Sequence, residues 1–190
     1  MKDIIKKSVA ESIAAKQQFF NSQNMDRIMS CASEIADALQ HKKKLVLFGN
    51  GGSAADCQHI AAEFVNRFRM ERRPLPAVAL TTDTSIITSI GNDYSFEEIF
   101  SKQVQALGCK GDIAIAISTS GNSANVLKAV EAARHMGIYT IGFSGISGRL
   151  RKMTDLAFCV DCAETARIQE VHILLAHIIC DLTERMIFNE

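Results

Sequence analysis

Apolar residues recur along this chain with two alternating patterns, one typical of helices and one of short buried strands. Helical spacing predicts two helices within residues 1–43, interrupted at 21–24, and a long closing helix, Thr165–Phe188. It also predicts helices at residues 54–68, 85–90, 96–107 and 123–136. Short apolar runs between these segments predict five strands, at residues 45–48, 77–80, 112–117, 139–143 and 156–160.

The alternation of strands and helices is typical of a parallel sheet covered by helices on both faces. We therefore predict an α/β fold, a doubly wound five-stranded parallel sheet, in a single domain spanning residues 1–190. The two N-terminal helices and the long C-terminal helix exceed what such a sheet needs. Their apolar stripes predict packing against other copies of the chain, so we expect a homo-oligomer, most simply a tetramer with a central helix bundle.

Composition narrows the classes of partner. Lys and Arg number 21 and Asp and Glu number 21, and this zero net charge argues against nucleic acid and anionic membranes as partners. No run reaches the roughly 18 apolar residues of a membrane-spanning helix. The first 20 residues lack the pattern of a signal peptide, so we expect a cytoplasmic protein with six reduced cysteines. Cys159 and Cys162 have no second Cys pair beside them, and we expect two thiols at a strand end.

Two predicted strands end in loops of small residues that precede a helix. The glycine loop (residues 49–53) reads G-N-G-G-S, and the serine loop (residues 118–122) reads S-T-S-G-N and is followed by Ser123. Backbone N–H groups at a helix start attract anions, and the serine hydroxyls suit a phosphate monoester. The glycine loop has neither the lysine of a nucleotide P-loop nor the dinucleotide fingerprint. One such loop would be read as a helix cap, but two at corresponding places favour a ligand site.

A second group of candidate residues lies on two predicted helices. His59 and Glu63 are four residues apart, with an aspartate one turn earlier, so they can share a metal ion or a substrate hydroxyl. The alternative is a solvated surface pair. In the closing helix, Gln169, His172 and His177 interrupt an apolar run and need polar partners. For His172 we expect a core histidine bonded to a carbonyl group.

Five segments carry a resemblance to a known family. They are F-G-N-G-G-S at 48–53, Q-H-I-A-A-E at 58–63, I-G-N-D at 90–93, I-S-T-S-G-N-S at 117–123 and A-R-I-Q-E at 166–170. Together they resemble the phosphoheptose isomerase family, which has the sugar isomerase (SIS) fold. The resemblance covers nearly the whole chain. The serine loop alone would indicate only the SIS fold, whereas the set of His59, Glu63, Gln169 and His177 is far more specific. Some members have an acidic residue where this chain has Ala166.

The resemblance implies an aldose–ketose isomerase that converts sedoheptulose 7-phosphate to D-glycero-D-manno-heptose 7-phosphate through an enediolate. It implies Glu63 as the base, His177 as the acid/base partner, and one zinc ion per subunit. The implied zinc ligands are His59, Glu63, Gln169 and His177. The implied substrate-binding residues are Asn50, Gly51, Gly52, Glu63, Asn92, Asp93, Ser118, Thr119, Ser120, Ser123 and Gln169.

One spacing complicates the implied zinc site. Gln169 and His177 are eight residues apart, which is about 12 Å of rise on a continuous helix. They can meet at one ion through long side-chain reach, by coming from two subunits, or if Gln169 precedes the regular helix. The rival function is a phosphosugar-binding or replication-initiator-associated SIS protein without isomerase activity. A pure binder does not need an acid, a base and metal ligands in one set, so we favour the enzyme.

Overall fold

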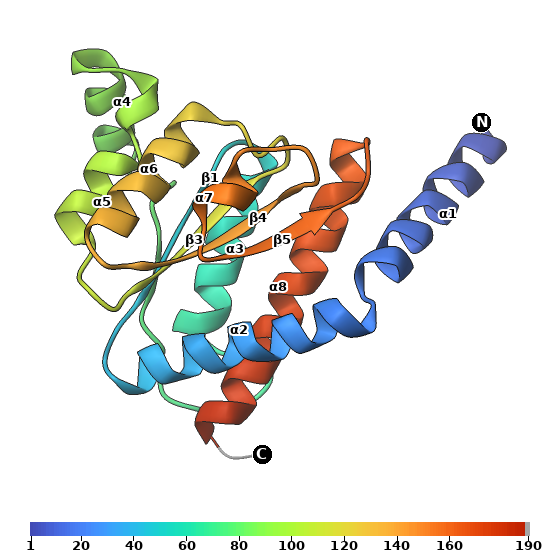
Figure 1. Cartoon of the computed structure of the whole chain (residues 1–190), viewed down its shortest axis with the longest axis horizontal. Coiled ribbons are helices and arrows are strands. Elements are labelled where there is room, and N and C mark those ends of the chain that lie inside the picture. The colour runs from blue at the N-terminus through green and yellow to red at the C-terminus, as the bar shows by residue number, and fades with distance from the viewer. Residues whose placement is uncertain (189–190) are drawn as a thin grey trace.

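A sheet of five parallel strands forms the centre of the structure, a computed structural model that describes residues 1–188 (Figure 1). The strand order is β2-β1-β3-β4-β5, and all neighbouring strands pair in parallel. The strands are β1 (Leu45–Gly49), β2 (Ala77–Ala79), β3 (Ile113–Ser118), β4 (Tyr139–Gly145) and β5 (Leu156–Val160). The predicted doubly wound parallel sheet is therefore confirmed, and all five predicted strands are present.

Helices precede, connect and follow the strands. They are α1 (Lys2–Phe19), α2 (Ser22–Gln40), α3 (Gly52–Val65), α4 (Thr84–Asp93), the 3-10 helix η1 (Phe96–Glu98), α5 (Ser101–Leu107), α6 (Ala124–His135), α7 (Leu150–Met153) and α8 (Thr165–Phe188). The predicted pair of N-terminal helices and the long closing helix are confirmed. Among residues 1–188, no helix is both long enough and apolar enough to span a bilayer.

Three predicted helix boundaries were wrong, for local reasons. The helix predicted at 54–68 ends at Val65, and the amides of Phe68 and Arg69 bond to a side chain of α8 instead of continuing the helix. The helix predicted at 96–107 is divided into η1 and α5, where the Ser101 hydroxyl bonds the carbonyl and carboxylate of Glu98. The short helix predicted at 85–90 continues to Asp93.

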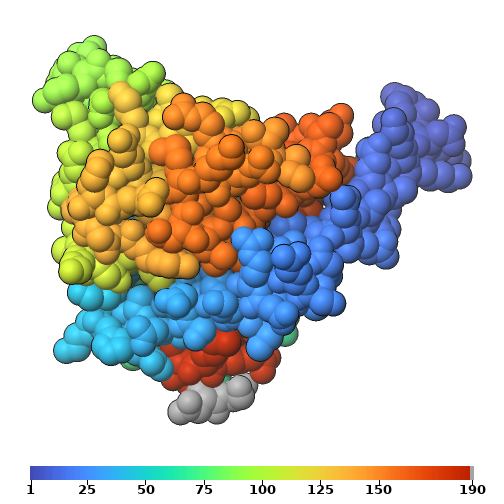
Figure 2. Space-filling model, in the orientation of Figure 1, coloured from blue at the N-terminus to red at the C-terminus, as the bar shows by residue number. Residues whose placement is uncertain are grey.

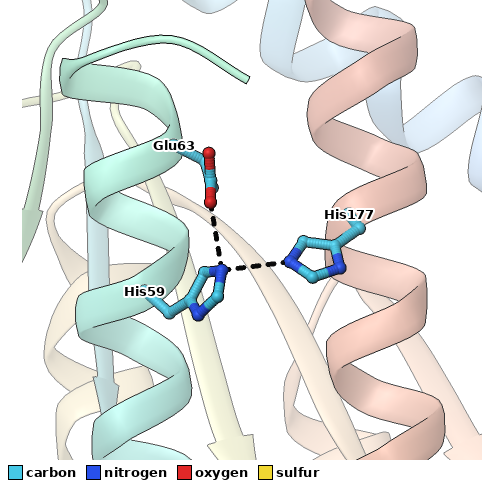
Figure 3. Close-up of side chains that lie close together, drawn as sticks. All are labelled: His59, Glu63 and His177. Carbon is cyan, nitrogen blue, oxygen red and sulfur yellow. Dashed lines mark hydrogen bonds and ion pairs between the residues drawn. The ribbon is translucent and has the colours of Figure 1, made fainter. Parts of the chain in front are cut away.

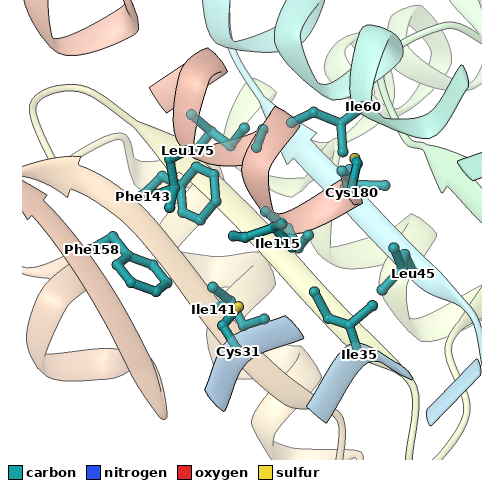
Figure 4. Close-up of a cluster of buried hydrophobic side chains, with 14 of the residues drawn as sticks. Cys31, Ile35, Leu45, Ile60, Ile115, Ile141, Phe143, Phe158, Leu175 and Cys180 are labelled. Atoms are coloured by element: carbon teal, nitrogen blue, oxygen red, sulfur yellow. The ribbon is translucent and has the colours of Figure 1, made fainter. Parts of the chain in front are cut away.

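The side chains of β1 and β3 alternate between two apolar cores, one on each face of the sheet. Leu45 and Leu47 of β1 lie in the first core, which α2, α3 and α8 cover (Figure 4). Val46 and Phe48 lie in the second core, which α5 and α6 cover. Because both faces are buried, the strands read as continuous apolar runs. This packing fixes α3 and α8 on the same face of the sheet.

The strand order determines where a ligand site can form. In an open parallel sheet, ligands bind beyond the carboxyl ends of the strands, where the order reverses direction. Here β1 lies between β2 and β3, so the reversal lies at the β1–β3 pair. The glycine loop follows β1 and the serine loop follows β3. The two loops selected from the sequence therefore lie side by side at the expected binding edge.

Two apolar surfaces are left without a partner in the single chain. Helix α1 projects away from the rest of the molecule (Figures 1 and 2), and its Ile5, Val9 and Ile13 side chains are 64%, 54% and 50% exposed. An apolar groove of about 350 Å³ lies between α2 and α8, with Met29 and Ile178 among its lining residues. Surfaces of this kind are typical of protein interfaces.

His172 of α8 is a core histidine, as expected. It is 1% exposed, its Nε2 atom lies 3.3 Å from the Ser144 carbonyl oxygen, and its ring lies 5.6 Å from that of Phe143. Burial lowers the pKa of His172 to about 4, and the contact with Ser144 only partly opposes this shift. The residue is therefore neutral in the folded protein at pH 7.

This burial predicts a specific loss of stability in mild acid. The pKa of His172 is lower in the folded than in the unfolded chain, so its contribution is complete above pH 6.5 and is lost as the pH falls toward 4. Between pH 7 and 5 the loss should be about 2 kcal/mol in the free energy of unfolding. His172→Gln, which keeps a donor but does not titrate, should lack this part of the pH dependence in urea titrations. Equal pH dependence in both proteins would contradict the assignment.

Candidate functional site

The glycine loop brings the start of α3 against α8. Gly51 has a φ of +55°, which residues with side chains rarely adopt. At Gly52, an added Cβ atom would lie 2.4 Å from Nε2 of Gln169, so glycine leaves room for this side chain in its present conformation. Gln169 thus lies beside the first turn of α3, next to the glycine loop.

Asn50 connects the glycine loop to the helix that follows the serine loop. The side-chain amides of Asn50 and Asn125 each donate to the other, and both N–O distances are 2.9 Å. Asn125 is buried in the first turn of α6, and its Oδ1 atom also accepts from the Val126 amide. The pair holds the two loops at a fixed separation.

The serine loop gathers three hydroxyl groups. The Ser118 Oγ atom lies 3.0 Å from that of Ser123 and 3.4 Å from that of Ser120. The loop borders a cleft of about 270 Å³, which Thr119 and Ser120 line together with Thr165 and other residues after β4 and β5. Hydroxyl donors in a cleft at a helix start form a suitable site for a phosphate group.

Three further candidates converge between α3 and α8 (Figure 3). The Nε2 atom of His59 lies 3.0 Å from Oε1 of Glu63 and 3.1 Å from Nε2 of His177. The His59 side chain is 48% exposed and that of Glu63 is 23% exposed. The structure therefore brings together three of the four residues implied as zinc ligands, and the His59–Glu63 pair is more than a solvated surface pair.

The donor set fits a metal ion. The potential ligand atoms of His59, Glu63 and His177 all lie within 4.8 Å of one another. Ligands held about 2.0–2.1 Å from one tetrahedral zinc ion lie roughly 3.3 Å apart, close to the two separations that involve His59, 3.0 and 3.1 Å. The Nε2 atom of His59 carries either one hydrogen or one lone pair, so it cannot satisfy a carboxylate and a second imidazole nitrogen together. A shared cation would satisfy all three.

His177 lies in a partly apolar setting. Burial lowers the pKa of His177, the neighbouring His59 lowers it further, and the Glu63 carboxylate opposes both effects. The Phe68 ring stacks on the imidazole at 5.4 Å between centroids, with 24° between the planes. His177 is therefore held neutral at pH 7, in the state that can bind a metal ion or accept a proton.

Gln169 lies apart from these three side chains. Helix α8 begins at Thr165, which excludes the alternative that Gln169 precedes the regular helix. The side-chain amide of Gln169 lies beside Gly52 of α3. Gly52 is seven residues before His59, which is about 10 Å along the helix axis. A role for Gln169 as a fourth ligand thus depends on a change of rotamer or on a second subunit, and it stays a prediction.

Asn92 and Asp93 lie at the end of α4, whose Ile87 and Ile90 pack against the second core. Their side chains bond to each other at 2.9 Å, and within residues 1–188 they make no hydrogen bond to another predicted site residue. The substrate role of Asn92 and Asp93 stays a prediction.

Ala166, in the first turn of α8, is exposed.

Several residues of this region were not selected from the sequence. Phe68 contacts His177, and the buried Glu184 and Arg72 organise the segment that carries Phe68. Glu184 is seven residues after His177, so an acidic group on the same face of an apolar helix was the available signal. Asp56 is the aspartate that the sequence placed one turn before His59; it has a buried Oδ2 atom without a hydrogen-bond partner in the described residues, and burial raises its pKa while His59 opposes the rise.

Comparison with known proteins gives consistent results along the chain. The SIS domain family matches residues 10–145. The chain is 53% identical to a phosphoheptose isomerase of Nitratidesulfovibrio vulgaris strain Hildenborough over 98% of this chain and 89% of the relative. It is 51% identical to a phosphoheptose isomerase of Thermodesulfovibrio yellowstonii over 100% of this chain and 94% of the relative.

Solved structures agree. Phosphoheptose isomerase GmhA from Neisseria gonorrhoeae is 44% identical with a TM-score of 0.89, over 96% of this chain and 98% of that chain. A phosphoheptose isomerase from Francisella tularensis is 38% identical with a TM-score of 0.91, over 96% and 97%. With this similarity over the whole fold, and with the glycine loop, the serine loop and the His–Glu–His cluster in place, the chain belongs to the SIS domain family and, within it, to the phosphoheptose isomerases.

Proposed function

We propose that this protein is an aldose–ketose isomerase that converts sedoheptulose 7-phosphate to D-glycero-D-manno-heptose 7-phosphate. The observation that carries the proposal is the convergence of His59, Glu63 and His177 between α3, which begins at the glycine loop, and α8. The names of the full-length relatives support the substrate class. A protein that only bound sugar phosphates would need the serine loop but not this cluster.

The reaction moves one proton between neighbouring carbons and one between neighbouring oxygens. In the proposal, the Glu63 carboxylate removes the C1 proton of the ketose and returns it to C2, giving the aldose. His177 carries the second proton, which leaves the O1 hydroxyl and is delivered to O2. No atom is gained or lost, and the intermediate is an enediolate whose negative charge must be stabilised.

The protein's own groups suit these tasks. Glu63 is partly exposed, so its carboxylate can reach a bound sugar, and its contact with His59 holds it in one orientation. His177 is kept neutral by burial, so it can accept a proton from a hydroxyl. Ser118, Ser120 and Ser123 present hydroxyl donors for the phosphate, which would anchor the far end of the substrate.

Zinc is the metal that we propose for the site, with His59, Glu63 and His177 as ligands and Gln169 as the fourth. The chemistry that zinc supplies when bound is polarisation of the carbonyl and hydroxyl oxygens. Two imidazole nitrogens and a carboxylate oxygen are ligands that this ion accepts, in a site that stays open to substrate.

Glu63→Gln tests the base. The variant keeps the size of the side chain but removes the proton acceptor, so turnover in a coupled assay on sedoheptulose 7-phosphate should fall at least ~100-fold at saturating zinc. Circular dichroism should show an unchanged fold. Wild-type turnover in this variant would exclude Glu63 as the base.

A pair of histidine variants tests the metal site. His177→Ala removes one ligand nitrogen and the proposed proton carrier, so zinc affinity should fall at least ~10-fold and turnover should fall with it. His172→Ala should lower stability and leave zinc content unchanged, because His172 is a core residue that contacts Ser144 of β4 and is not part of the His59–Glu63–His177 cluster. Loss of zinc from His172→Ala alone would reverse the assignment. Full activity of zinc-free wild type in chelator would leave a metal-free acid–base pair.

We also propose that the protein assembles as a tetramer in the cytoplasm, with α1 and the α2–α8 groove as interfaces. The exposed Ile5, Val9 and Ile13 stripe and the apolar groove support this. Light scattering of the wild type should give four times the chain mass. Ile5→Glu with Val9→Glu should give smaller particles, whereas Lys6→Glu, also exposed on α1, should not. A monomeric wild type at micromolar concentration would refute the proposal.

A further inference from the structure

Glu184 is the most fully bonded carboxylate near the cluster. It is on α8, two turns beyond His177, and its side chain is 1% exposed. Its oxygens accept from the backbone amides of Phe68, Arg69 and Met70 at 3.2, 2.9 and 3.0 Å. Three successive amides are therefore bound to one side chain, which fixes the backbone of the segment that follows α3.

Arg72 completes the arrangement from the opposite side. Its side chain is 3% exposed, and its Nε atom lies 2.8 Å from Oε1 of Glu184. Its other nitrogens donate to backbone carbonyls at the end of α3, including Phe64 at 2.7 Å and Glu63 itself at 2.8 Å. The guanidinium group thus joins the last turn of α3 to a carboxylate of α8.

These contacts surround the cluster without being part of it. The amide of Phe68 is bonded to Glu184, and the Phe68 ring stacks on His177. The carbonyl of Glu63 is bonded to Arg72, and the Glu63 carboxylate contacts His59. One buried ion pair therefore holds the backbone of one cluster residue and the stacking partner of another.

We propose that Arg72 and Glu184 are positioning residues that set the distance and orientation of Glu63 relative to His177. Neither residue touches the reacting atoms. The pair acts by fixing the register between the end of α3 and the middle of α8, so that the three ligand atoms face one point. The expected change in kcat rests on the proposed function, whereas the expected change in zinc affinity rests only on the metal site.

If Arg72 and Glu184 only stabilised the fold, their loss would lower stability but leave the metal site unchanged. A similar buried ion pair far from the cluster serves as the control. Asp112 is also a 1% exposed carboxylate in an ion pair, with Lys44, and it accepts from the amides of Lys44 and Cys109 at 3.1 and 2.8 Å. It lies just before β3, at the edge of the sheet opposite to the two loops. Asp112→Asn therefore removes a similar network far from the cluster.

The variants to compare are Arg72→Lys, Glu184→Gln and Asp112→Asn. Lysine keeps the charge of Arg72 but replaces the guanidinium fork with a single ammonium group, which cannot reach Glu184 and all of the bonded carbonyls at once, so Arg72→Lys is the milder change. Glu184→Gln leaves a buried guanidinium without its counter-charge, and it is the variant at greater risk of unfolding. Each protein is stripped with chelator and titrated with zinc at a temperature where circular dichroism shows it folded, and kcat and KM are then measured.

All three variants should melt at lower temperature than the wild type. In Arg72→Lys and Glu184→Gln, the Kd for zinc should rise ~10–100-fold and kcat should fall at least ~10-fold, with KM changed less than ~3-fold. Asp112→Asn should keep both zinc affinity and kcat within ~3-fold of the wild type. If Glu184→Gln does not fold, Arg72→Lys decides.

A folded Arg72→Lys with wild-type zinc affinity and kcat would overturn the proposal and leave the pair a purely structural role. A wild type that binds zinc but does not isomerise sedoheptulose 7-phosphate would refute the proposed function, and the zinc titrations would still decide this inference. If the wild type isomerises without zinc, the kcat of Arg72→Lys and Glu184→Gln relative to the wild type decides whether the pair positions the site. A wild type with neither property would overturn both.

Discussion

The packing of α3 against α8 is the contact on which the candidate site depends. Its two ends are fixed in different ways. At the start of α3, Gly52 has no side chain and Gln169 occupies the space. At the end of α3, Arg72 and Glu184 close the contact through a buried ion pair. Between these ends, His59, Glu63 and His177 face each other. A close side-chain contact at one end and a buried ion pair at the other thus bracket the part of the helix contact where three polar side chains can share one ion.

Removing a carboxylate from water costs free energy, which other groups must offset. Glu184 and Glu63 differ in how deeply they are buried and in the partners that offset this cost. Glu184 is fully enclosed and has backbone amides and a guanidinium as partners; burial alone would raise its pKa, but these bonds hold it below the ordinary value. Glu63 is nearer the surface, with an imidazole as its partner. The deeper carboxylate is committed to the fold, whereas the shallower one keeps bonding capacity for a ligand.

Local patterns were sufficient for much of this arrangement. The apolar runs predicted the strands, and the glycine and serine loops predicted the binding edge, because parallel strands end in register and small residues leave loop amides accessible. The four-residue spacing predicted that His59 and Glu63 share a face. What could not be predicted was contact between distant segments. The segment that follows α3 bonds to Glu184, and Gln169 lies in the space beside Gly52. The spacing of apolar residues along the chain contains no information about either contact.

The hydrogen-bonded side chains of Asn50 and Asn125 affect how the glycine loop can bind a ligand. Each amide donates one N–H to the other and accepts one in return, and Asn125 also accepts from the first turn of α6; of its two N–H groups, Asn50 uses one in the pair and keeps one for a ligand. Hydrogen bonds in a chain polarise one another. An anion that drew on the free N–H would alter the acceptor strength of the same amide toward Asn125. The two loops are thus joined by an amide pair that can itself take part in binding the ligand.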